Sequence, residues 1–174
     1  MLALFGVNCM AQQIDDNHVA VVRYPQQLKK LTAAQLTEYA NKRFKKGSRL
    51  FNAATRRPIF TSVVDDIIFD VNKPRVLNTL KKGETAADHI KEIKHNVDMW
   101  NELDTYTSTI ETVNGNFVFI GDHPLDDTVR YFTFACLNKA NTAIVDGRVT
   151  FRKDQKAQAN QLLHELLNSI SFKK

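Results

Sequence analysis

Two strand-like runs of this chain are apolar on both of their alternating faces. They cover residues 117–120 and 130–137. Successive side chains of a β-strand point to opposite faces, so a strand with one wet face alternates apolar and polar residues. In the first run Phe117 and Phe119 point one way while Val118 and Ile120 point the other. The pattern therefore predicts a sheet that has helices on both of its faces.

Local signals predict the helices and turns around these strands. A capping box of Thr32 and Gln35 begins a first helix, for which Gly47 is the expected stop. A second helix begins at Thr85, and its apolar residues recur at steps of three and four. The residues of this seam are Ala86, Ile90, Ile93, Val97 and Trp100. A third helix is predicted over residues 155–168, followed by a short strand that ends near Phe172.

The remaining strands follow from turn signals. Asn114-Gly115 between apolar runs predicts a tight hairpin. Asp146-Gly147 indicates either another hairpin or a bulge in one long strand, and we favour the bulge. A first strand is expected over residues 18–24. Two further β-like runs are expected between Arg49 and Val71, with a break at Asp65-Asp66.

These elements predict one α/β (α+β) domain with a mostly antiparallel central sheet and helices on both faces. A chain of 174 residues favours a single domain, which we place at residues 12–174. Residues 1–11 read as a truncated secretory signal, with an apolar run from Leu2 to Val7 and small residues before Gln12. A lipoprotein signal with Cys9 as the acylated residue and a buried N-terminal segment are the alternatives. We therefore expect a periplasmic or secreted protein without a transmembrane segment.

Basic side chains are concentrated in the first third of the chain, where ten Lys and Arg residues face three acidic ones. The densest group is Lys42, Lys45, Lys46, Arg49, Arg56 and Arg57. Steps of three and four residues place the first four on one helix face. Such a face attracts an acidic protein, a phosphate-bearing surface or an anionic membrane surface. Nucleic acid is not expected, because few aromatic residues interleave with the cluster; a plain solubilising face is the simpler interpretation.

A second candidate is the stretch from Gly121 to Asp127, which we expect to form a polar loop between two buried strands. It brings together Asp122, His123, Asp126 and Asp127. Carboxylates can hold Ca²⁺, and a histidine beside a carboxylate can act as an acid or base. The spacing is not that of a calcium loop, so we expect neither a metal nor a cofactor here.

Two other groups have structural interpretations. His89, Glu92 and His95 share a helix, but a separation of six residues is strained for a common metal, so a solvated face is expected. Cys136 lies in the middle of a strand and is expected to be a buried thiol.

The order of elements resembles the PsbP-like superfamily, which includes PsbP, the Ran release factor Mog and DcrB-type proteins. The resemblance rests on Val113-Asn-Gly115, on Tyr131-Phe-Thr-Phe134 and on the closing segment from Asn168 to Lys173. It implies a PsbP-like α/β/α sandwich and a binding module rather than an enzyme. The expected function is an exported, non-catalytic module that engages a protein partner. The alternatives are a small-ligand carrier and a hydrolase-type enzyme that uses Asp122 and His123.

Overall fold

The computed structural model describes residues 14–56, 61–77, 83–101 and 105–173. Four α-helices lie in this part of the chain: α1 (Ala33–Arg43), α2 (Arg49–Arg56), α3 (Ala86–Met99) and α4 (Lys156–Ser169). The strands are β1 (Ile14–Asp16), β2 (Ala20–Arg23), β3 (Lys29–Lys30), β4 (Thr61–Val64), β5 (Ile67–Val71), β6 (Arg75–Val76), β7 (Thr107–Val113), β8 (Asn116–Pro124), β9 (Val129–Leu137), β10 (Ala143–Arg152) and β11 (Ser171–Phe172). The α+β class predicted from the sequence is confirmed.

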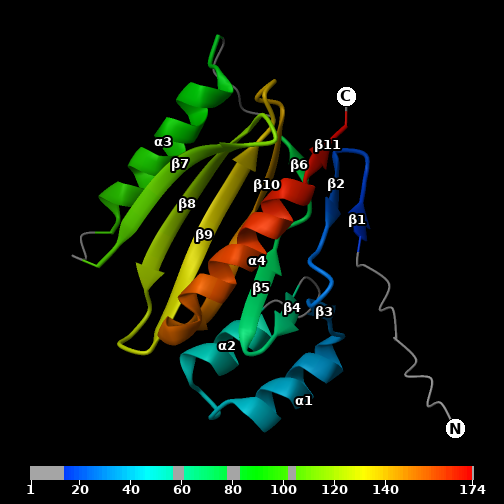
Figure 1. The fold of residues 1–174 in the computed structure, drawn as a ribbon, viewed down its shortest axis with the longest axis vertical. Coiled ribbons are helices and arrows are strands. Elements are labelled where there is room, and N and C mark those ends of the chain that lie inside the picture. Colours follow the sequence, from blue (N-terminus) through cyan, green and yellow to red (C-terminus); the bar gives the residue numbers. More distant parts are fainter. Residues whose placement is uncertain (1–13, 57–60, 78–82, 102–104, 174) are drawn as a thin grey trace, which may run out of the picture.

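The main sheet has eight strands, in the order β3-β4-β5-β10-β9-β8-β7, with β6 paired to the start of β10. Each pairing described is antiparallel. A second sheet, β1-β2-β11, joins the first strands of the described chain to its last strand (Figure 1). The long strands β8, β9 and β10 form the centre of the main sheet.

Helices cover both faces of this sheet, as the doubly apolar strands predicted. On one face, Val118 and Ile120 of β8 pack in a core with α4, which runs in front of β9 and β10 in Figure 1. On the other face, Phe119 packs with Ile90 of α3, and Phe117 lies against the same cluster. The alternation of side chains along β8 therefore supplies two separate cores.

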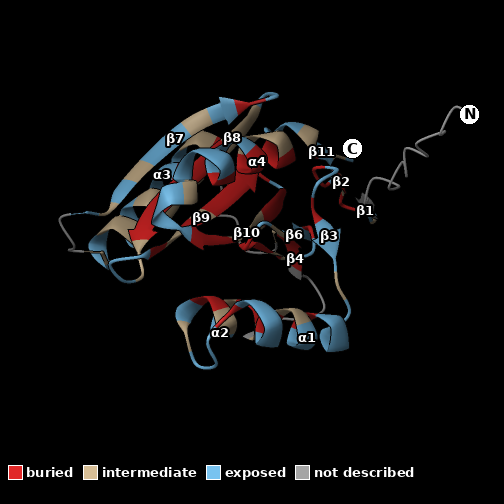
Figure 2. Ribbon diagram, turned by 60° about the horizontal axis from the view of Figure 1, so that its bottom comes forward, coloured by how far each residue is buried: buried red, intermediate tan, exposed pale blue. Residues whose placement is uncertain are grey.

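A third core lies under α1 and α2, which form a pair in both views (Figures 1 and 2). The predicted capping box is present, because the Thr32 side chain accepts from Gln35 and the Gln35 side chain accepts from Thr32. The helix ends at Arg43, however, and Gly47 lies in the following turn. Phe44 leaves the helix in an extended conformation and is buried in this core, which ends α1 before Gly47.

The predicted strand after Arg49 is wrong, since residues 49–56 form α2. Leu50 and Ala54 are buried four residues apart, which is a helical spacing. The Ser48 hydroxyl accepts from the backbone N–H of Phe51 at 3.2 Å, as an N-cap does. The break at Asp65-Asp66 is confirmed, because both residues have positive φ between β4 and β5.

Asn114 and Gly115, with φ of 52° and 77°, form the predicted hairpin between β7 and β8. Asp146-Gly147 forms no hairpin. β10 runs through it, and its register with β9 is continuous, so the bulge that we favoured is not seen against β9. Glycine is required by close packing instead: a Cβ at Gly147 would lie 2.7 Å from the backbone oxygen of Asp70.

Trp100 does not continue the predicted seam of α3. Ala86 and Ile90 are buried and Val97 is half-buried, but Trp100 is 84% exposed. The helix ends at Met99, so Trp100 is a C-cap residue and leaves the helical phase that places Val97 against the sheet.

Some sequence-based predictions fall outside the described residues. The signal segment at residues 1–11 and the side chains of Arg56 and Arg57 are among them. No helix in the described part of the chain has both the length and the apolar character that crossing a membrane requires.

Candidate functional site

The predicted loop from Gly121 to Asp127 is divided by the structure into two parts, because β8 extends to Pro124. Asp122 and His123 belong to β8 and are buried, whereas Asp126 and Asp127 are exposed between β8 and β9. Neighbouring residues of a strand point to opposite faces. Asp122 and His123 therefore lie on different sides of the sheet and do not form one acid–base pair.

Asp122 lies on the α4 side and is held by two cations. Arg130 Nε donates to its Oδ1 at 2.8 Å, and Lys156 Nζ lies 2.7 Å from its Oδ2. Since Lys156 is the first residue of α4, the carboxylate ties the start of this helix to β8 and β9. It also lines a cavity of about 530 Å³ between β7 and α4.

His123 lies on the α3 side in a stack of rings. Its imidazole is parallel to the Tyr131 ring, with centroids 4.5 Å apart, and Tyr106 covers it at a tilt of 44°. Its Nδ1 lies 2.9 Å from Asn101 Oδ1 and its Nε2 lies 2.8 Å from Thr133 Oγ1. Burial, together with the charge of Arg148, lowers the pKa of His123 to about 4. Both ring nitrogens are thus occupied, and the ring is neutral at pH 7.

This pKa predicts a loss of stability in mild acid. The unfolded chain protonates His123 near its ordinary pKa of 6.5, and the folded protein only near about 4. Between these values the unfolded state binds more protons, so stability falls as the pH is lowered through this window. In urea unfolding at a series of pH values, the free energy of unfolding should fall less steeply with decreasing pH in His123→Gln than in the wild type. If the assigned NMR signals of the His123 imidazole titrate near 6.5 in the folded protein, the prediction is contradicted.

Asp126 shapes the turn in which it lies. Its Oδ1 accepts hydrogen bonds from the backbone and hydroxyl of Thr128 and from the backbone of Val129, all within 2.9 Å. The backbone bond from Thr128 leads the contributions that lower the pKa of Asp126. Asp127 is exposed in the same turn.

The basic residues do not form one helix face. Lys42 lies in the last turn of α1 and pairs with Glu38, Lys45 and Lys46 lie in the turn, and Arg49 begins α2. All four are exposed. The helices α1 and α2 lie together at one end of the molecule (Figure 2). Arg49 also acts on the β8–β9 turn, since its charge contributes to the lowered pKa of Asp126.

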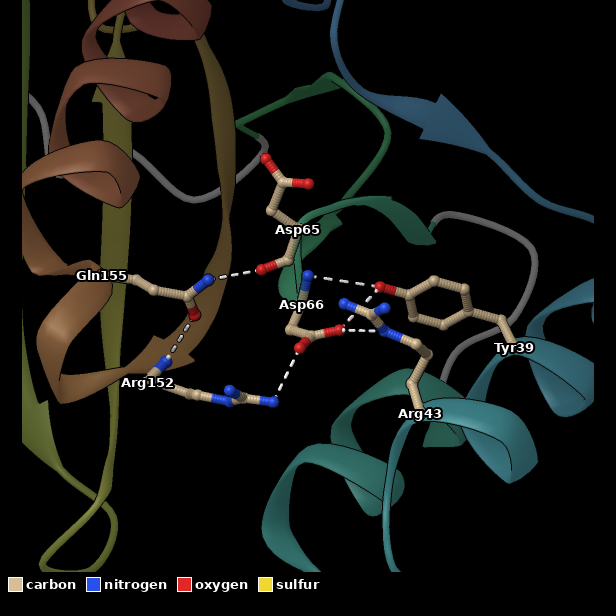
Figure 3. Close-up of polar contacts among 6 residues, drawn as sticks. All are labelled: Tyr39, Arg43, Asp65, Asp66, Arg152 and Gln155. Carbon is tan, nitrogen blue, oxygen red and sulfur yellow. Dashed lines mark hydrogen bonds and ion pairs between the residues drawn. The ribbon is translucent and has the colours of Figure 1, made fainter.

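Arg43, in the same run, is engaged by a buried carboxylate that the sequence did not reveal. Asp66 accepts from Arg43 Nε at 2.8 Å, from the Tyr39 hydroxyl at 3.1 Å and from Arg152 Nη2 at 2.7 Å (Figure 3). Beside it, the Gln155 side chain donates to the backbone oxygen of Asp65. These six residues, which we call the Asp66 cluster, join α1, the β4–β5 turn and the end of β10.

Two of the other side chains considered from the sequence, His89 and Cys136, have a hydrogen-bond partner or are buried. His89 Nδ1 lies 2.9 Å from Asn141 Oδ1 at the side of α3, and His95 is exposed on the same helix. Cys136 is buried, and burial raises the pKa of its thiol to about 12. Within the described ranges, no group of three His, Cys, Asp or Glu side chains could hold a metal ion.

A cavity beside α3, which we call the α3 cleft, was not predicted. It measures about 510 Å³ and lies on the face of the sheet that carries His123. Its apolar lining consists of Leu77, Ile93, Val97, Phe119, Phe134, Ala135, Ile144 and Gly147. Its polar lining consists of Asp70, Asn72, Arg75, His89, Thr133, Asp146 and Arg148. These residues come from β5, β6, α3, β8, β9 and β10 or the segments next to them.

Two arginines of the α3 cleft have different surroundings. Arg75 donates to both carboxylate oxygens of Asp146, at 2.6 and 3.0 Å, so its charge is balanced. Arg148 is half-buried, and its guanidinium lies 3.6 Å from the centroid of the Tyr131 ring. Tyr131 in turn stacks on His123. The cleft therefore combines an apolar wall with one arginine that is held by a ring stack.

No protein-family model matches this chain, and no curated protein matches it either.

Proposed function

We propose that this protein is a non-catalytic binding protein and that the α3 cleft holds a small ligand. The observation that carries the proposal is the cleft itself. Ligand sites are concave, have volumes of about 300–1,000 Å³, and combine an apolar lining with a few polar groups. A cavity of about 510 Å³ between Val97 of α3 and Phe119 of β8 has this size and this composition.

Asp122 and His123, the two residues considered for catalysis, are both engaged by other side chains. A histidine that acts as a general base needs a ring nitrogen that can take a proton from substrate and a pKa near the working pH. His123 has both nitrogens within hydrogen-bond distance of side chains, and its pKa is lowered to about 4. Asp122 is on the opposite face, in contact with Arg130 and Lys156.

The experiment is an NMR titration of the labelled protein with decanol, a neutral apolar probe. We expect shifts in the amides of α3 and of the strands that line the cleft. Val97→Trp should abolish them, because an indole ring would occupy the cleft beside α3. Met99→Trp is the matched control, since Met99 is 55% exposed on the same helix and does not line the cavity. Absence of shifts in the wild type, or equal shifts in both variants, would contradict the proposal.

A protein partner at the basic residues is a second candidate function. It is favoured by the exposure of Lys45, Lys46 and Arg49, which gather at the α1–α2 turn. Surface charges of this kind accelerate encounter with an acidic partner, and salt weakens their effect. In capture experiments from the envelope of the source cells, Lys45→Glu with Lys46→Glu should lose the partner while Asp127→Asn retains it. Equal capture by the two variants would speak against this surface. We also propose that the protein is exported to the periplasm or outside the cell and that it is related to the PsbP-like superfamily.

A further inference from the structure

We propose that the ligand of the α3 cleft is an organic anion with an apolar body, whose acidic group binds Arg148. This inference rests on the proposed function and names the chemical class of its ligand.

Arg148 is held in place through one face of its guanidinium. Its central carbon lies over the Tyr131 ring, 3.6 Å from the ring centroid, a separation at which two planar groups meet face to face. The Tyr131 ring is parallel to that of His123, with an interplanar angle of 1°. Hydrogen bonds to Asn101 and Thr133 fix His123 in turn. The N–H groups of a guanidinium lie in its plane, so contact through the face leaves them able to bind an acidic group.

Arg148 also lacks an anionic partner in the part of the chain that the structure describes. Asp70 is its neighbour in the β5–β10 register and has an interaction of its own. None of the ion pairs seen among the described residues involves Arg148. The positive charge of Arg148 also acts on His123, where it contributes to the lowered pKa. A half-buried cation is stabilised by a paired anion, which a ligand would provide here.

The rest of the cleft defines the body of the ligand. Arg75 and Asp146 neutralise one another, so they favour neither sign of charge. Ile93, Val97 and Phe119 line the same cavity as Arg148. A molecule that spans both regions places its acidic group at Arg148 and an alkyl or aromatic body against α3 and β8. Free apolar acids and acyl-bearing anions share this chemistry.

The experiment compares decanoate with decanol at pH 7, because the two probes share an alkyl chain and differ in charge. The wild type should bind decanoate about tenfold more tightly, as a charge-assisted hydrogen bond to a fixed arginine implies. Arg148→Gln should bind both probes equally and keep the wild-type affinity for decanol, which would show that the cleft is intact. Arg148→Lys should show an intermediate preference, since it keeps the charge and loses the planar contact.

Each alternative result has a distinct meaning. If neither probe binds, the proposed function fails and this inference fails with it. If the wild type binds both probes equally, or if Arg148→Gln keeps the preference for decanoate, the cleft binds ligands but Arg148 does not select anions. Arg49→Gln is the matched control for attraction to the exposed basic residues. A loss of decanoate preference in Arg49→Gln, with none in Arg148→Gln, would place the anion at the α1–α2 turn and overturn the inference.

Discussion

Replacing Phe151 by alanine is expected to lower the free energy of unfolding by about 3–5 kcal/mol, the range for large-to-small changes at buried aromatic residues. Phe151 lies on β10 with no exposed surface, and its ring centroid is 4.5 Å from that of Phe132 on β9. Both belong to the core that α4 covers. Loss of the ring therefore removes packing and leaves a cavity between the sheet and this helix. Urea unfolding followed by far-ultraviolet circular dichroism gives the measurement.

Phe172→Ala is the matched control for this prediction. Phe172 packs against the same core from β11 but is only half-buried. Its truncation therefore removes less buried apolar surface and leaves a smaller cavity. Phe172→Ala should therefore lower the free energy of unfolding by clearly less than Phe151→Ala does. Trp100 is a poor fluorescent reporter for either variant, because it is already exposed in the folded protein. A loss below about 1 kcal/mol for Phe151→Ala would show that the core relaxes around the missing ring.

The sheet and its two covered faces could be predicted because strand burial is a local, period-two signal. Phe117 and Val118 reveal two buried faces within adjacent positions, and the structure places them in different cores. The Asn114-Gly115 hairpin and the Thr32 cap are equally local, since backbone conformation or a side chain three residues away decides them. The helix α4 was predicted because its buried leucines recur at helical spacing.

The errors occur where tertiary packing decides the outcome. Whether a helix that reaches Arg43 continues to Gly47 depends on the burial of Phe44 under α1 and α2, which the local sequence does not specify. The strand predicted after Arg49 is a different kind of error, because the local signals of a helix are present: Ser48 is a cap, and Leu50 and Ala54 have helical spacing. At position 147 a glycine is required because the Asp70 carbonyl on a neighbouring strand leaves no room for a Cβ atom.

The candidate sites show the same division. Sequence placed Asp122 next to His123, and only the extension of β8 to Pro124 reveals that they point to opposite faces. The α3 cleft is assembled from residues between Asp70 and Arg148, so no continuous motif marks it. The stack of Arg148, Tyr131 and His123 depends on the register of three strands. Arg148 stands four positions before the end of β10, and nothing in its local sequence marks this arrangement.

The Asp66 cluster supplies the second large effect: Asp66→Ala is expected to lower the free energy of unfolding by about 3 kcal/mol. The Asp66 side chain is 4% exposed and accepts hydrogen bonds from two arginines and one tyrosine. Hydrogen bonds to charged groups contribute about 1.5–3 kcal/mol each when considered singly. The sum is smaller here, because the two arginine side chains are about half exposed and regain water when the carboxylate is removed.

Backbone strain must be separated from the loss of these bonds, since Asp66 has a φ of 70° and alanine is disfavoured there. Asp65→Ala is the matched control: Asp65 precedes it with a φ of 45°, but its side chain is exposed and outside the contacts with Arg43 and Arg152. If contacts dominate, Asp66→Ala should lower the free energy of unfolding by much more than Asp65→Ala does. Tyr39→Phe should then lower it by less in the Asp66→Ala background than in the wild type. Equal losses from the two aspartate variants would instead assign the whole effect to the turn between β4 and β5. The carboxylate would then not be what joins α1 to the sheet.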